Sequence, residues 1–148
     1  MASKKRHLYC GSVHHIYNRG VLKKDIFHYE HDYKIFVGKI LKYKSRYPTE
    51  VLAFCLMPNH FHFLLRETGE ETPLIPIFMQ QLQSSYAKYY AEKYNHSGKL
   101  FQGTYKNKLI NDDKYYLDVV NYIINNPVKN NLVESSDQWK FKYLKGHL

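Results

Sequence analysis

Two histidines separated by one residue, His60 and His62, are the residues of this sequence best suited to chemistry. On a β-strand, residues i and i+2 point to the same face, so both imidazoles project together while Phe61 and Phe63 turn to the other face. Two neutral imidazoles at this spacing are a ready pair of metal ligands. The alternative is two histidines on a half-exposed strand. The apolar run at 51–57 instead predicts a central position in the sheet, where unpartnered polar rings are costly to bury.

The last predicted helix offers a third ligand. At about 100° per residue, Tyr115, Tyr122 and Asn126 fall on one strip beside the apolar face of that helix. Tyr122 and Asn126 lie one turn apart, so an Asn126 carbonyl oxygen that bound a metal would hold the Tyr122 hydroxyl close to it. In a chain with 15 tyrosines, however, a single tyrosine is more often a core or surface ring than a nucleophile.

A metal ion and a tyrosine together support phosphoryl transfer. The metal polarises a phosphate oxygen, and the phenolate attacks phosphorus to form a phosphotyrosine bond. This bond conserves the energy of the phosphodiester, so a cut strand can be rejoined. Mg²⁺ or Mn²⁺ is the expected ion, because phosphoryl chemistry favours hard cations with spare coordination sites. Tyr115 is the competing nucleophile, whereas Tyr116 is expected to turn toward the core.

The elements that must position these residues follow from the hydrophobic periodicity. Strands are expected at 8–17, 51–57, 60–66 and 106–110, with helices at 33–46 and 75–94 and a last helix that is capped by Asn111 or Asp112 and ends before Asn126-Pro127. The order β-α-β-β-α-β plus a helix predicts a ferredoxin-like (RRM-like) α+β fold, with a four-stranded antiparallel sheet and helices on one face. No repeat or linker divides residues 1–148, so one domain is expected.

Composition favours a polyanionic partner. The chain has 22 Lys and Arg against 13 Asp and Glu, a formal charge of +9, and 15 Tyr, 8 Phe and 1 Trp. Lysine and arginine release counterions from phosphates, and aromatic rings stack on exposed bases. No apolar run is long enough to span a membrane, and no signal core follows the basic start. Cys10 and Cys55 form no disulfide framework and are expected to be small buried side chains, which favours the cytoplasm.

Four blocks of the sequence together resemble a known family. Residues 57–66 (Met-Pro-Asn-His-Phe-His-Phe-Leu-Leu-Arg) and 122–128 (Tyr-Ile-Ile-Asn-Asn-Pro-Val) resemble the single-tyrosine HUH transposases. Residues 14–20 (His-His-Ile-Tyr-Asn-Arg-Gly) resemble the opening strand of the REP-associated tyrosine transposases, and residues 98–106 resemble their segment before the catalytic helix. The blocks occur in the family's order and extend over nearly the whole chain.

The resemblance implies a metal-dependent endonuclease and strand transferase that acts on single-stranded DNA. His60 and His62 match the metal-binding histidines, and Tyr122 matches the nucleophile. Asn126 stands where the wider class supplies a third polar ligand, often glutamine. Substrates in such families are single strands with imperfect hairpins, which are cut to leave a 5′-phosphotyrosine and a free 3′-hydroxyl. Some relatives are homodimers that place the tyrosine helix beside the partner's histidines, while others act as monomers.

Several basic residues are candidates for contact with the DNA backbone. They are Arg19, Lys4, Lys5, Arg6, Lys99, Lys106 and Lys108. Two other functions are compatible with the sequence: a non-catalytic binder of single-stranded RNA or DNA on the same fold, and a small metal-binding domain without nucleic acid. A covalent adduct with a hairpin oligonucleotide would distinguish the transposase from both.

Overall fold

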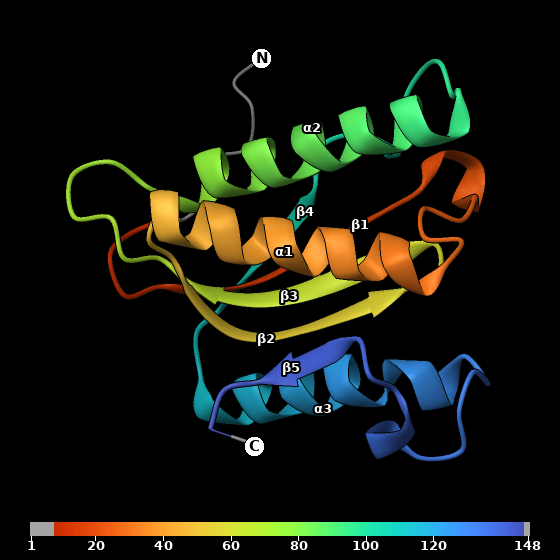
Figure 1. Cartoon of the computed structure of the whole chain (residues 1–148). Helices are drawn as coiled ribbons and strands as arrows, with labels where there is room; N and C mark the ends of the chain where they lie inside the picture. The colour runs from red at the N-terminus through yellow and green to blue at the C-terminus, as the bar shows by residue number, and fades with distance from the viewer. Residues whose placement is uncertain (1–7, 147–148) are drawn as a thin grey trace.

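The computed structural model describes residues 8–146, and five strands of this region form one antiparallel sheet (Figure 1). The strands are β1 (Val13–Arg19), β2 (Glu50–Met57), β3 (His60–Arg66), β4 (Lys106–Ile110) and β5 (Lys142–Leu144), in the order β4-β1-β3-β2-β5. The α-helices are α1 (Glu30–Arg46), α2 (Ile75–Tyr94) and α3 (Asp113–Lys129), with short 3₁₀ helices at Val21–Lys23 and Ser136–Gln138. The fold is therefore α+β, as predicted.

The central strand of the sheet is β3, which carries the two histidines. It pairs with β2 through a tight hairpin in which Met57 faces His60 across the Pro58-Asn59 turn. On its other side it pairs with β1, where Tyr17 faces His62 and Arg19 faces His60. A strand paired on both sides has its backbone fixed by two ladders, so the side chains on each of its faces are held in register.

The two faces of the sheet are covered by different helices. Figure 1 shows α1 and α2 side by side on one face and α3 on the opposite face. Phe61 and Phe63 are fully buried in the core under α1 and α2, together with Phe36 and Tyr86. On the other face, Cys55 and Leu64 pack in a smaller cluster with residues of α3. By alternation along β3, His60 and His62 lie on this second face.

Helix α3 continues through the proline at which it was expected to end. It begins after Asp112, whose carboxylate accepts a hydrogen bond from the backbone N–H of Tyr115 at 2.7 Å, so the predicted cap is confirmed. Pro127 lies inside the helix. Beyond it, the backbone N–H groups of Asn130 and Leu132 donate to the carbonyls of Asn126 and Pro127. These bonds close the last turn, and they keep Asn126 helical and one turn after Tyr122.

Some expectations about individual elements were wrong. The fifth strand, β5, was not predicted, so the sheet has five strands and not four. The i, i+3, i+4 spacing predicts Leu41 on the inner face of α1 with Phe36 and Ile40, but Leu41 is 63% exposed and Tyr43 is buried instead. Cys10 is exposed, whereas Cys55 is buried as expected. The first strand begins at Val13 because Cys10 and Gly11 form the preceding turn, in which the backbone N–H of Ser12 donates to the carbonyl of Tyr9.

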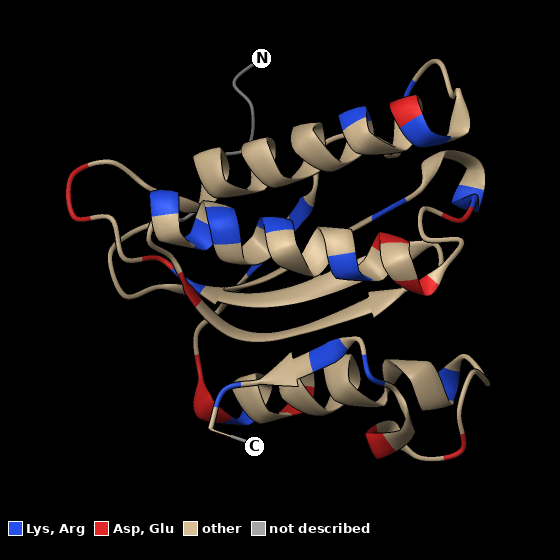
Figure 2. Ribbon diagram, in the orientation of Figure 1, with Lys and Arg blue, Asp and Glu red and all other residues tan. Residues whose placement is uncertain are grey.

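Charge is spread over the molecule and does not mark one face. Figure 2 shows Lys and Arg on α1, on α2 and on the sheet, and Asp and Glu at the loop after β3, at the starts of α1 and α3 and in the segment after α3. Within residues 8–146, no helix has the length and apolar character needed to cross a membrane.

Candidate active site

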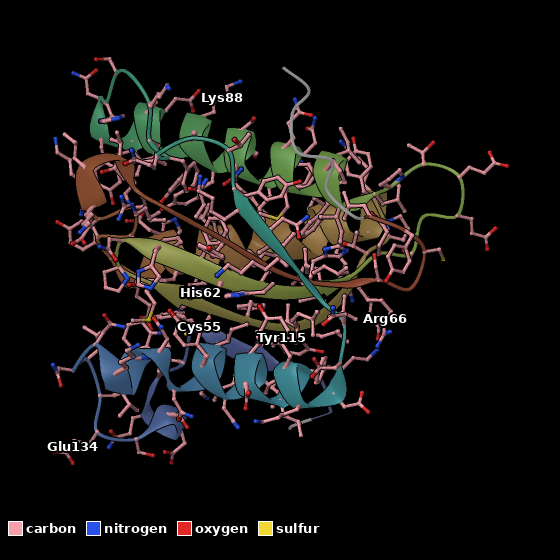
Figure 3. The ribbon with its side chains drawn as sticks, turned by 180° about the vertical axis from the view of Figure 1, so that it is seen from behind. Cys55, His62, Arg66, Lys88, Tyr115 and Glu134 are labelled. Carbon is pink, nitrogen blue, oxygen red and sulfur yellow. The ribbon has the colours of Figure 1, made fainter. Side chains whose placement is uncertain are left out.

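The two histidines of β3 face α3, as the alternation along the strand requires. Their ring centroids are 5.1 Å apart and the rings are nearly perpendicular, at 88°. Figure 3, which views the molecule from behind, shows His62 on the sheet above α3. His62 is only 5% exposed, and His60 is half-buried at the turn. The pair thus lies between the sheet and α3, at one end of β3.

Asn126 is brought to His60 from α3. Its Oδ1 atom lies 2.9 Å from Nε2 of His60, and the side chain is almost completely buried. The orientation of its amide follows from the neighbouring Asn130. The amide nitrogen of Asn130 donates to the backbone carbonyl of Asn126 at 2.8 Å and also lies 3.1 Å from Oδ1 of Asn126. An NH₂ group requires an acceptor, so the atom of Asn126 that faces both Asn130 and His60 is its oxygen.

Tyr122 lies against His62 from the same helix. Its ring meets that of His62 edge-on, with 5.3 Å between the centroids, and it lies 6.0 Å from the ring of His15. The residue is 43% exposed and lines the cleft described below. The ammonium group of Lys129 lies 5.3 Å from the centroid of the Tyr122 ring. Of the sequence-predicted residues, His60, His62, Asn126 and Tyr122 are therefore brought together within one chain.

A cleft of about 1060 Å³ opens between β1, β4, the segment 102–104 and α3, and His60, His62 and Tyr122 line it. Tyr115, the competing tyrosine, also lines the cleft and is labelled on α3 in Figure 3. Of these two tyrosines, Tyr122 is the one whose ring contacts His62 and His15. The geometry consequently favours Tyr122 as the tyrosine that acts with the histidine pair.

The cations predicted to contact DNA separate into three groups. Arg19, Lys106 and Lys108 line the cleft, and Lys23 joins them although it was not predicted. Lys99 is exposed but does not line the cleft. The remaining three candidates, Lys4, Lys5 and Arg6, lie outside the described residues.

Burial keeps the imidazoles of the site neutral near pH 7. Desolvation, with the nearby charges of His15 and His60, lowers the pKa of His62 to about 2. Burial also lowers the pKa of His60, although the hydrogen bond to Asn126 opposes this shift. For His15, burial and the charge of Lys108 lower the pKa to about 4. Neutral imidazoles have one nitrogen lone pair each, which is the form that binds a metal.

The surroundings of His60 fit a bound cation. Its Nδ1 faces Oδ1 of Asn59 at 2.6 Å, and the amide nitrogen of Asn59 donates to the carbonyl of Lys23, which fixes that amide as well. Both ring nitrogens of His60 therefore face acceptor oxygens, but a neutral ring has one N–H. If Nδ1–H donates to Asn59, the lone pair of Nε2 faces the Oδ1 lone pairs of Asn126. A cation between these two atoms would be bound by both.

The donor set also suits a hard divalent ion. Adjacent ligands around an octahedral Mg²⁺ at about 2.1 Å are separated by about 3 Å. The distance of 2.9 Å between Nε2 of His60 and Oδ1 of Asn126 is close to that value. In residues 8–146 no group of three or more His, Cys, Asp or Glu side chains is arranged to hold a metal. Two imidazoles and one amide would supply only three ligands to such an ion, which would leave coordination positions for phosphate oxygens.

Two further residues of the site were not predicted, His15 and Tyr17. Both lie on β1, where residues 15, 17 and 19 alternate onto the face that carries the histidine pair. Nε2 of His15 lies 3.0 Å from Nδ1 of His62, and the ring of Tyr17 lies 5.8 Å from that of His62. The alternation of β1 was visible in the sequence, but its pairing with β3 was not.

The fold and this site define an α+β domain with a histidine pair and a tyrosine facing each other across a cleft. The family model for IS200-like transposases matches residues 11–126, and the chain belongs to this family. This confirms the family resemblance that the four sequence blocks indicated.

Individual relatives agree with this assignment. A Haemophilus influenzae protein assigned as a REP-associated tyrosine transposase is 32% identical over 106 residues, which cover 66% of this chain and 60% of that protein. The structure of a REP-associated tyrosine transposase bound to a REP hairpin matches with a TM-score of 0.78 and 20% identity, over 96% of this chain and 82% of that one. A Deinococcus radiodurans protein assigned as a transposase matches with a TM-score of 0.55 and 18% identity, over 84% and 97% of the two chains. The two structural matches show the shared fold.

Proposed function

We propose that this protein is a metal-dependent transposase that cleaves and rejoins single-stranded DNA through a 5′-phosphotyrosine at Tyr122. The observation that carries the proposal is the position of Tyr122, which lies against His62 on the helix that also brings Asn126 to His60. The nucleophile therefore lies beside the candidate metal ligands, at the place where α3 meets the sheet. We also assign the β-α-β-β-α-β frame, with its strand order β4-β1-β3-β2, to the ferredoxin-like class.

In this proposal His60, His62 and Asn126 hold a Mg²⁺ or Mn²⁺ ion. Such an ion would supply Lewis acidity, which would polarise a non-bridging oxygen of the scissile phosphate and stabilise the charge that develops on it. The phenolic oxygen of Tyr122 forms a bond to phosphorus, and the bond from phosphorus to the 3′-oxygen breaks. The phenol loses its proton and the 3′-oxygen leaves as a hydroxyl, so the protons balance. Attack by a 3′-hydroxyl on the same phosphorus reverses the step and joins two strands.

The substrate we propose is a DNA single strand that carries a hairpin. The family membership supports a DNA substrate, and a structural relative is bound to a REP hairpin. The cleft is open and carries Arg19, Lys23, Lys106 and Lys108, which suit a phosphate backbone. Tyr17, which is half-buried on the cleft wall, offers a ring on which an unpaired base can stack.

We further propose that the site works in cis. The ring contact between Tyr122 and His62 is made within one chain, so no second copy is needed to bring the nucleophile to the histidines. A homodimer that exchanges α3 would have to break this contact and the packing of Val119 and Ile123 against the sheet.

A hairpin oligonucleotide with single-stranded flanks tests the function. Incubation with Mg²⁺ or Mn²⁺ is expected to give a protein–DNA adduct that survives denaturation and maps to Tyr122. Salt-sensitive binding without an adduct would instead indicate a non-catalytic nucleic-acid binder. The absence of both binding and adduct across a set of hairpins that includes those flanking the gene would contradict the proposal.

A further inference from the structure

A second pair of imidazoles lies beside the candidate metal ligands. Nε2 of His15 on β1 is 3.0 Å from Nδ1 of His62 on β3, and the two rings are stacked with 5.2 Å between their centroids. Both side chains are less than a tenth exposed, His15 at 7% and His62 at 5%. A hydrogen bond between two buried neutral rings is stronger than one in water, because the local dielectric constant is low.

This hydrogen bond determines which ring nitrogen of His62 remains available to bind a ligand. Since Nδ1 is engaged by His15, Nε2 is the ring nitrogen that can bind a ligand. His60 has the same arrangement, because its Nδ1 is held by Oδ1 of Asn59 while its Nε2 faces Asn126. Each candidate ligand thus has its Nδ1 next to an acceptor on the protein and its Nε2 directed elsewhere.

His15 is not placed to be a ligand itself. Among the described residues no three His, Cys, Asp or Glu side chains could hold one metal ion, so His15, His60 and His62 do not form a three-histidine site. Nε2 of His15 is already engaged with Nδ1 of His62. Any effect of His15 on metal binding therefore acts through its hydrogen bond with His62.

We propose that His15 is a positioning residue, which accepts a hydrogen bond from Nδ1–H of His62 and thereby fixes the ring and the tautomer that present the Nε2 lone pair to a metal. The inference deepens the proposed function, on which its metal-binding part rests. Histidine ligands commonly donate their second N–H to such an acceptor, and loss of the acceptor typically lowers metal affinity 10- to 100-fold. Here the acceptor is a second histidine on the neighbouring strand.

Two variants separate the acceptor from the bulk of the ring. His15→Leu fills the buried site with an apolar side chain and removes the acceptor. His15→Gln keeps an oxygen that can reach the position of Nε2 and accept the same bond. The control is His14→Leu, because His14 is a buried imidazole on the same strand that turns to the opposite face and bonds to Ser12 and Asn107.

The first readout needs neither metal nor DNA. In the metal-free protein, with ¹⁵N-labelled histidine, NMR is expected to show His62 as the Nδ1–H tautomer in the wild type, in His15→Gln and in His14→Leu. In His15→Leu it should become a mixture of tautomers. A wild-type His62 that carries its proton on Nε2, or an unchanged tautomer in His15→Leu, would overturn the proposal. The wild-type measurement decides the matter even if a variant does not fold.

The second readout is Mn²⁺ affinity of the full chain without DNA, measured by calorimetry or by the EPR signal of free Mn²⁺. His15→Leu should bind about 10- to 100-fold more weakly than the wild type, with His15→Gln within about threefold of it. Equal affinity in all variants contradicts the positioning role. If instead the tautomer and the affinity respond as expected but no covalent adduct forms at Tyr122, the proposed transposase chemistry fails and the role of His15 stands.

Discussion

Tyr122 and His62 come from different layers of the protein and meet edge to face, with 5.3 Å between their ring centroids and an interplanar angle of 87°. His62 is fixed by two strand ladders, and Tyr122 by a helix whose inner face packs on the sheet. Neither residue depends on a flexible loop for its position. The contact between them therefore belongs to the rigid core of the domain, which suits a preorganised site.

Replacement of Tyr122 by phenylalanine should abolish the covalent adduct while the fold stays intact. The substitution removes one oxygen from a side chain that is 43% exposed, so the free energy of unfolding should change by no more than about 1 kcal/mol. Adduct formation should disappear because no other group can form this bond. Denaturing gel electrophoresis with a labelled hairpin, together with urea denaturation, measures both effects.

Tyr115→Phe is the matched control for that experiment. Tyr115 lies on the same helix and lines the same cleft, but Tyr122 is the tyrosine that contacts His15 and His62. Cleavage by Tyr115→Phe should remain within about threefold of the wild type, a difference of less than 1 kcal/mol in the barrier. DNA attached to Tyr115, or an active Tyr122→Phe protein, would show that the nucleophile is the wrong tyrosine.

Loss of the metal should separate cleavage from binding. EDTA, His60→Ala or His62→Ala is expected to lower the cleavage rate at least about 100-fold, since the stabilisation of the transition-state charge is removed. Affinity for the hairpin should fall by only a few fold, because lysine and arginine contacts with phosphates supply much of the binding. Gel-shift and cleavage assays on the same oligonucleotide measure the two quantities. Full cleavage in both histidine variants would exclude these residues as ligands.

Neutral replacement of the lysines on β4 should weaken binding in a salt-dependent way. Lys106 and Lys108 line the cleft, whereas Lys99 is exposed outside it. For each lost phosphate contact, the slope of log affinity against log salt should decrease by about 0.7 for a single strand and about 0.9 for a duplex. Fluorescence anisotropy at several salt concentrations gives these slopes for Lys106→Ala and Lys108→Ala. A Lys99→Ala effect as large as theirs would mean that the DNA does not follow the cleft.

Asp32 should make the stability of the protein sensitive to acid. Its buried carboxylate holds α1 to α2 through Tyr89, Lys93 and Tyr94. Burial raises its pKa, but these hydrogen bonds and that from the backbone of His28 outweigh burial, so the pKa lies well below 3.8. The unfolded chain then binds the proton first as the pH falls. The stabilisation by Asp32 is complete above pH 3.8 and is lost progressively below it.

Asp32→Asn tests this dependence because it keeps the shape of the side chain and removes the charge. At pH 7 the variant should be less stable by roughly 1.5–3 kcal/mol, the range for hydrogen bonds to a charged group. The difference from the wild type should shrink as the pH falls below 3.8. Urea denaturation of both proteins between pH 2.5 and pH 7 supplies the comparison, and a difference that stays constant down to pH 2.5 would contradict the assignment.

Local patterns were sufficient to predict the elements that carry the site. The bounds of β3, α2 and β4 match the structure, because the Pro58-Asn59 turn and the capping segments are encoded within a few residues of each element. The spacing of Tyr122 and Asn126 also placed them on one side of α3, where both reach the histidine pair. Residues on one element are related by its period, which a sequence displays directly.

Relationships between elements were harder to predict. His15 was seen only as part of a strand, because its distance from His62 depends on the register of β1 against β3 over 47 positions of chain. β5 has three residues, too few for a period to appear, and it is held by pairing with β2. Pro127 suggested a helix end, but the bonds that close the last turn of α3 outweigh the preference of the residue before a proline.

Complementation between two inactive variants should reveal whether the site is built within one chain. His60→Ala lacks a candidate metal ligand, and Tyr122→Phe lacks the nucleophile. If Tyr122 acts with the histidines of its own chain, as the 5.3 Å contact with His62 indicates, each chain in a mixture has one defect and no site is complete. The mixed proteins should therefore form no more adduct than either variant alone. In a dimer that exchanges α3, pairs of unlike chains would hold one intact site, so adduct at about a quarter of the wild-type level would form at equal concentrations if subunits mix at random. That recovery would show that the tyrosine acts in trans.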